Sequence, residues 1–173
     1  MKIYEKNEFW IIVAVIVGFL LSTIWEVIKN QYSICTKRKA IESELQTNQG
    51  LIPQKIDILK QAKNSLAKGK LLSTTSVHFQ TYLYNSYIGE VGTSLSACNR
   101  ENLHIIYGTL KGIDISLDNF YREFLELSAS GQLDDPFRTY INMFDDNIDS
   151  LTRTKGLIDD YLSGNPRVVT WKE

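Results

Sequence analysis

Cysteine, proline and histidine are scarce in this chain, and each scarcity excludes a class of protein. Only two cysteines, Cys35 and Cys98, occur among the 173 residues, far apart and in no motif, so a disulfide framework is not indicated. Three prolines and ten glycines are too few for a disordered, low-complexity or turn-rich chain. Two histidines without an HxxxH or CxxC spacing predict no metal site.

Motifs of local catalytic chemistry are also missing. The sequence contains no GxSxG, no P-loop and no GxGxxG, so it predicts no catalytic residue, no bound cofactor and no enzyme. Asp145, Asn147 and Asp149 imitate the start of a calcium loop, but Ser150 replaces its glycine and Gly156 its bidentate glutamate. Net charge is −1, and the lysines of 55–70 lack interleaved aromatics, so no nucleic-acid partner is expected. An enzyme or ligand sensor whose site is assembled from distant residues remains open.

One long apolar run dominates the N-terminal part. Phe9 to Trp25 reads FWIIVAVIVGFLLSTIW, 17 residues without a charge, and Val27 and Ile28 extend it past Glu26. A helix crosses the hydrocarbon core of a bilayer with about 17–25 such residues. Residues 9–28 are therefore predicted to form a single transmembrane helix after a short tail, 1–8. A cleaved signal peptide is the main alternative, but the first eight residues are charge-balanced and no A-x-A site follows the run.

Residues within and beside the run indicate how it would sit in a membrane. Trp10 and Trp25 mark its two ends, as indole rings do at membrane interfaces. Ala14, Gly18 and Ser22 stand four apart and predict a ridge of small residues for helix–helix contact. Lys2 and Lys6 precede the run, whereas four cations follow it: Lys29, Lys37, Arg38 and Lys39. The larger number on the C-terminal side predicts a cytoplasmic C-terminal domain at the plasma membrane.

Charge is divided unevenly along the rest of the chain. Residues 26–70 carry nine Lys and Arg against four Asp and Glu, whereas residues 111–163 carry five against eleven. One interpretation is that the two regions pack side by side and complement one another. The other is that the basic arm contacts anionic lipid headgroups, where each nearby cation contributes about 1 kcal/mol.

Apolar residues recur at helical spacing through residues 29–165, the predicted soluble domain. The stripes continue from Asn30 to Leu66 and from Leu103 to Leu127, and they resume after Pro136. Gly50 and Pro53 predict either a kink or a new helix. Residues 76–88 fit a short helix better than a strand, with Phe79, Tyr82, Leu83, Tyr87 and Ile88 on one face. We therefore predict an all-α fold: a transmembrane helix that continues into a small antiparallel bundle of about four segments, followed by a tail, 166–173.

Three short patterns resemble those of a known group of proteins. An E-L-x-x-N element, here Glu44, Leu45 and Asn48, follows the membrane helix, and the next helix ends in LAKGK at 66–70. An L-x-x-x-Y element follows at Leu103 and Tyr107. The chain is similar, over residues 8–125, to uncharacterised, single-pass, helix-rich small membrane proteins of bacteria and archaea. No assigned activity accompanies that resemblance, so it implies no site residue, and Gly50 and Pro53 depart from the usual uninterrupted helix.

These observations predict a non-enzymatic, membrane-anchored interaction or scaffold module. Its expected partners are membrane lipids and either a second protein or another copy of the same chain. The first alternative is a lipid-surface structural or regulatory protein that uses the basic juxtamembrane arm. The second is the enzyme or ligand sensor with a non-local site.

Overall fold

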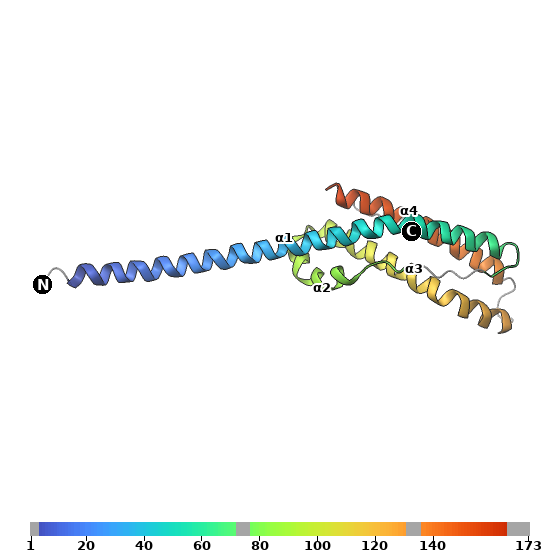
Figure 1. The fold of residues 1–173 in the computed structure, drawn as a ribbon, viewed down its shortest axis with the longest axis horizontal. Helices are drawn as coiled ribbons and strands as arrows, with labels where there is room; N and C mark the ends of the chain where they lie inside the picture. The colour runs from blue at the N-terminus through green and yellow to red at the C-terminus, as the bar shows by residue number, and fades with distance from the viewer. Residues whose placement is uncertain (1–3, 72–76, 131–135, 166–173) are drawn as a thin grey trace.

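The computed structural model describes residues 4–71, 77–130 and 136–165, and these ranges are almost entirely helical (Figure 1). The elements are α1 (Tyr4–Leu66), α2 (Tyr82–Val91), the 3-10 helix η1 (Gly92–Ser94), α3 (Ala97–Ser130) and α4 (Pro136–Leu162). No strand occurs in these ranges, which confirms the all-α class. The predicted C-terminal tail, 166–173, and the first three residues of the N-terminal tail lie outside them.

Helix α1 is a single element of 63 residues, about 95 Å long at 1.5 Å per residue. It begins at Tyr4, five residues before the predicted Phe9, and it continues through Pro53 without a new helix start. Pro53 lies on the exposed side, where water can satisfy the carbonyl that its ring leaves without a donor. Leu45, Ile52 and Leu59 on the opposite side are fully buried, so packing on both sides of the proline keeps the helix intact.

The bundle surrounds only the second half of α1, and the first half protrudes alone (Figure 1). Helix α4 runs antiparallel to α1, because Lys63 pairs with Asp145 while Gln49 bonds to Asp159. Helix α4 contacts both α1 and α3 and is antiparallel to each, as predicted for neighbouring helices, so α3 runs parallel to α1 (Figure 1). Residues 77–81, which lead into α2, are non-helical and are hereafter the strap. Fifteen residues separate Leu66 from Tyr82, and so long a connection removes the constraint that makes short-linked helices antiparallel.

Helix α2 differs from the prediction in its start and in its buried face. It begins at Tyr82 rather than at residue 76, and the Tyr82 side chain, predicted to face the core, is 77% exposed. Tyr84 and Val91 are buried instead. Thr81, the residue before the helix, makes no side-chain cap. Helix α1 supplies the cap, because the Glu44 carboxylate accepts hydrogen bonds from the backbone N–H groups of Leu83 (2.7 Å) and Tyr84 (3.0 Å).

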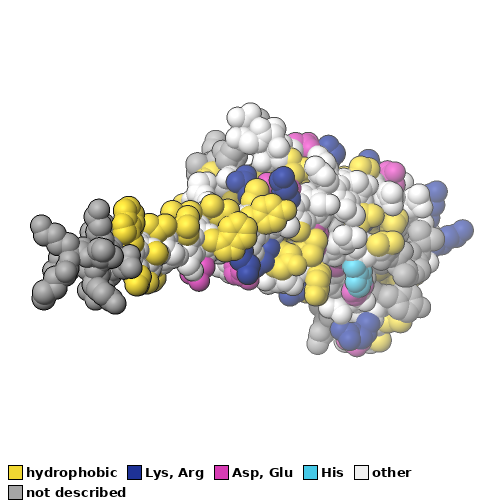
Figure 2. Space-filling view, turned by 60° about the vertical axis from the view of Figure 1, so that its left-hand side comes forward, with side chains coloured by type: hydrophobic (Ala, Val, Ile, Leu, Met, Phe, Trp, Pro, Cys, Tyr) yellow, Lys and Arg dark blue, Asp and Glu magenta, His cyan; other side chains and the backbone are white. Residues whose placement is uncertain are grey.

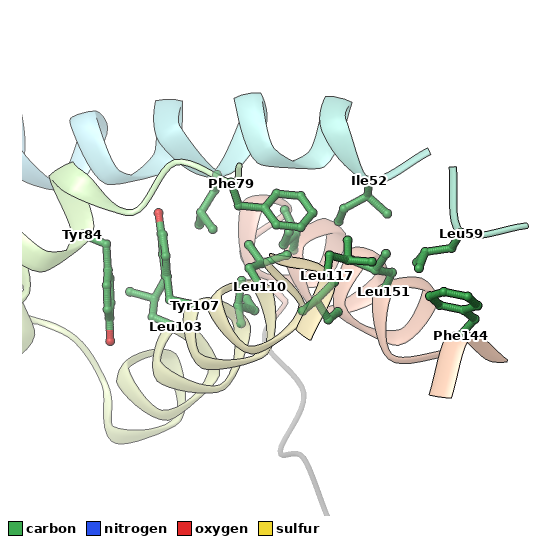
Figure 3. Close-up of a cluster of buried hydrophobic side chains, with 14 of the residues drawn as sticks. Ile52, Leu59, Phe79, Tyr84, Leu103, Tyr107, Leu110, Leu117, Phe144 and Leu151 are labelled. Carbon is green, nitrogen blue, oxygen red and sulfur yellow. The ribbon is translucent and has the colours of Figure 1, made fainter. Parts of the chain in front are cut away.

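The core is continuous from one end of the bundle to the other (Figure 3). The stripe predicted for α3 is buried from Leu103 to Phe124, and α4 adds Phe144, Leu151 and Ile158. Near the far end, Phe120 packs edge-on against Tyr140 and Phe144, with ring centroids 5.1 and 4.9 Å apart. This packing confirms the 3.6-residue periodicity read from the sequence of both helices.

Candidate functional site

The protruding part of α1 is the most unusual surface of the molecule. Its apolar residues from Trp10 to Ile28 are exposed except for the half-buried Val13, with exposed fractions of 64% for Trp10 and 67% for Trp25 (Figure 2). Helix α1 is the one helix in the described ranges that is long and apolar enough to cross a membrane, and the qualifying window is wholly exposed. A core helix of a water-soluble protein would bury such a surface.

The predicted ridge of small residues lies open on this protruding helix. Ala14, Gly18 and Ser22 are all exposed, and a Cβ atom added at Gly18 would meet nothing within 4 Å. Thr23, beside the ridge, donates its hydroxyl to the carbonyl of Phe19 at 3.0 Å, so this polar group is satisfied inside the helix. The ridge is therefore free to contact another helix.

A stalk of about 18 Å, residues 29–40, separates the apolar run from the bundle core, whose first buried residue is Ile41. The headgroup layer on one side of a bilayer is about 6 Å thick, so the stalk would hold the core well clear of the lipid. The four predicted cations lie on this stalk. Lys29 and Lys39 are exposed.

The other two stalk cations have partners within the chain. Lys37 forms an ion pair with Glu90 of α2, and its Nζ lies 5.8 Å from the centroid of the Tyr87 ring. Arg38 donates to Glu42 at 2.9 Å, and this hydrogen bond raises the pKa of the guanidinium. Deeper in the bundle, Lys63 pairs with Asp145 of α4. Part of the basic arm therefore complements acidic residues that pack beside it, as one of the two interpretations of the charge division expects.

A buried polar network joins α1, the strap and α3. Asn48 donates its amide Nδ2 to the carbonyl of Gln80 at 2.7 Å and accepts the Gln80 N–H at Oδ1 at 2.8 Å. Asp114 of α3 accepts the backbone N–H of Phe79 at 2.8 Å and forms an ion pair with Lys55. The Lys55 ammonium also lies 4.6 Å from the centroid of the Phe79 ring. Side chains from two helices thus hold the strap by its backbone, in place of a sheet or a helix.

Glu44 extends the same network to α2 and affects a neighbouring tyrosine. Tyr107 of α3 is 3% exposed, and its ring stacks on Tyr84 at 4.0 Å between centroids (Figure 3). Burial raises the pKa of Tyr107 far above its ordinary value, and the negative charge of Glu44 raises it further. The Tyr107 hydroxyl makes no hydrogen bond of good geometry within the described residues. It therefore stays protonated in the folded protein at any physiological pH.

Neither histidine belongs to a cluster of metal ligands. His78 on the strap bonds to Asp118 at 3.0 Å, and His104 accepts or donates a bond with the Tyr84 hydroxyl at 3.2 Å. Glu101 and His104 stand three apart on α3, a spacing that some metal sites use. Within the described ranges, however, no three His, Cys, Asp or Glu residues come together as a metal site would require.

Sequence reasoning missed most of the buried network. Glu44 and Asn48 stood out only as part of a short pattern, and no role followed from it. The sequence did not single out Lys55 or Asp114, since their partner groups are backbone atoms and side chains far away in the sequence. The sequence holds one local signal, the helical spacing of these residues. Glu44, Asn48 and Lys55 fall on the same buried face of α1 as the apolar Ile52.

No family model matches the chain, and comparisons with curated proteins and with solved structures found no match. The resemblance to small single-pass membrane proteins therefore stays a prediction. The functional proposal rests on geometry.

Proposed function

We propose that the chain is a membrane-anchored interaction module. Helix α1 crosses the plasma membrane once with residues 9–28, and the bundle is displayed on the cytoplasmic side. There it binds a protein partner or a second copy of the chain. This role needs no catalytic residue and no cofactor.

One observation carries the proposal: the same continuous helix supplies the exposed apolar run and one face of the bundle core. Ile41, Leu45 and Ile52 of α1 are fully buried in the bundle, while the ridge at Gly18 is open. A contact between two helices in the membrane would therefore set the position of the two bundles relative to one another. The polar network couples α1 to the strap and α2, so the bundle would follow α1 as a unit.

Membrane insertion and orientation are tested with the native cysteines. Cys35 is exposed on the stalk, and the variant Cys98→Ser leaves it as the single thiol. The protein should remain in the membrane pellet after alkaline carbonate extraction. A membrane-impermeant maleimide should label Cys35 only after cells are permeabilised. Labelling in intact cells would reverse the orientation, and extraction into the supernatant would contradict the anchor.

Self-association is tested on the full chain by light scattering in detergent, with the detergent mass subtracted. Gly18→Leu fills the ridge, whereas Leu20→Phe enlarges a side chain about 200° around the helix and serves as the control for a change outside the ridge. We expect a dimer or larger for the native protein and for Leu20→Phe, and a monomer for Gly18→Leu. The interaction role would be contradicted if the native protein were a monomer and if its purification from solubilised membranes recovered no partner protein.

A second candidate, a lipid-surface role, is favoured by Lys29 and Lys39. Both are exposed on the stalk and have no ion-pair partner among the described residues. The test places a fluorophore on Cys35 and compares its emission in nanodiscs of neutral lipid with its emission in nanodiscs of anionic lipid. The native protein should show a difference between the two lipids, and the variant with both lysines changed to Gln should show none. If the native protein shows no such sensitivity, the basic arm does not act at headgroups.

A further inference from the structure

A cavity lies between the first turn of α2 and the middle of α3, and the interaction role makes no use of it. Its volume is about 180 Å³, and Thr81, Tyr84, Asn85, His104, Tyr107, Gly108 and Lys111 line it. An apolar protein cavity of about 150 Å³ is large enough to hold benzene. A molecule with a body of that size therefore fits between the two helices.

Two stacked aromatic rings are part of the cavity lining. Tyr84 and Tyr107 lie 4.0 Å apart between centroids, and their planes differ by 9°. The bond between the Tyr84 hydroxyl and His104 holds the first ring in place. Rings fixed in this way give the cavity a preformed apolar lining that a planar apolar body can contact.

Gly108 opens the cavity, and packing within the chain does not explain it. It stands in the interior of the 34-residue helix α3, where glycine is about 1 kcal/mol less favourable than alanine. Glycine in a helix can permit the close approach of a neighbouring element, but a Cβ atom added at Gly108 or Gly112 would meet nothing within 4 Å. Gly108 lines the cavity and Gly112 does not. The two glycines therefore form a matched pair for an experiment.

The polar groups around the cavity favour a negatively charged ligand. Lys111 is exposed and has no ion-pair partner among the described residues, and no acidic side chain is part of the described lining. Asn85 and Thr81, which bond to one another at 3.3 Å, add an amide and a hydroxyl. An ammonium with neighbouring neutral donors suits a carboxylate better than a neutral or cationic group.

We propose that this cavity binds a small carboxylate with a planar apolar body, which lies along Tyr84 and Tyr107 while its charge is held at Lys111. The ligand would contact α2 and α3 at once, so its binding would stabilise α2 on the bundle. This inference is independent of how the chain is anchored or what the bundle binds.

The experiment uses the full chain in micelles, with benzoate as the probe and benzamide as its uncharged counterpart. Amide chemical shifts of Gly108 and Lys111 are followed during titration to about 20 mM. We expect saturable shifts with benzoate, at least tenfold weaker binding of benzamide, and at least tenfold weaker benzoate binding by Lys111→Gln, since a charge-assisted bond is lost.

Gly108→Leu fills the cavity, and Gly112→Leu makes the same change outside it. Gly108→Leu should abolish the saturable shifts, and Gly112→Leu should leave them unchanged. Lys111→Gln tests the same site if Gly108→Leu proves misfolded by circular dichroism. The proposal is overturned if native protein shows no saturation, if benzamide binds as well as benzoate, or if folded Gly108→Leu or Lys111→Gln binds benzoate normally.

Discussion

Removing one partner of the buried Lys55–Asp114 pair should destabilise the bundle far more than removing both. Asp114→Asn preserves the size of the side chain and an acceptor for the Phe79 N–H, but it removes the negative charge that Asp114 places beside the buried Lys55 ammonium. Lys55 is 2% exposed in its side chain and Asp114 10%. Removing one partner of a buried ion pair costs about 3–5 kcal/mol. Lys55→Met should cost a similar amount, because it leaves the carboxylate behind.

The double variant, Lys55→Met with Asp114→Asn, should recover most of that loss. Both charges are then absent, and the thioether packs against the Phe79 ring where the ammonium lay. Replacement of a buried pair by neutral groups of similar volume is often neutral or stabilising. The two single effects should therefore be strongly non-additive, as expected for groups in direct contact.

Urea unfolding of the full chain in micelles, followed by circular dichroism at the helical band, measures these differences. The Lys63–Asp145 pair is the control, because its side chains are 34% and 50% exposed. Lys63→Met and Asp145→Asn should each change stability by at most about 1 kcal/mol. Single variants at Lys55 or Asp114 that lose less than about 1 kcal/mol, or a double variant whose loss is the sum of the two, would show that the two charges do not depend on one another in the folded protein.

Three further results are expected. Asn48→Ala leaves both backbone groups of Gln80 without partners, so it should cost about 2–4 kcal/mol and speed hydrogen exchange at Gln80, whereas exposed Gln46→Ala should do neither. Tyr107→Phe should be at least as stable as native protein at pH 7, because within the part of the chain that the structure describes the buried Tyr107 hydroxyl makes no hydrogen bond that the replacement would lose. Its advantage should be about 1.4 kcal/mol larger at pH 11, since the raised pKa of Tyr107 contributes stability below pH 10 that is lost as pH rises. If the native protein and Tyr107→Phe lost the same free energy of unfolding between pH 7 and pH 11, the Tyr107 hydroxyl would not be buried. Gly50→Ala should stabilise the bundle by about 0.5–1 kcal/mol in urea unfolding, because Gly50 is exposed inside α1 with open space beyond it; a loss would indicate an undetected contact.

Helix type, helix ends and apolar faces follow from local signals in this chain. The periodic stripe of α3 predicted its buried residues one by one, since a regular helix converts spacing directly into a face. Gly69 and Gly164 adopt positive φ values of 69° and 76° just after α1 and α4, where only glycine is free of strain. Pro136 occupies the first position of α4, as its fixed φ favours.

The strap and the start of α2 could not be predicted from local sequence patterns. A helical stripe was predicted across 76–88, yet Phe79 and Gln80 are non-helical because Asn48 and Asp114 bind their backbone groups. Those partners are 32 and 35 residues away, so no window of sequence contains the interaction. Tyr82 was predicted to lie in the core because the helix was expected to begin earlier. Whether its side chain is buried or exposed depends on where α2 begins.

The sequence alone determined the all-α class, the exposed apolar run of α1 and the core faces of α3 and α4, because each depends on residues a few positions apart. Tertiary structure alone decided that α1 passes through Pro53, that α1 and α3 are parallel, and that Glu44 caps α2. Each of these depends on contacts between distant segments, which outweigh local propensities of about 1–3 kcal/mol. The cavity beside Tyr84 and Tyr107 has the same origin, since it exists only where α2 and α3 meet.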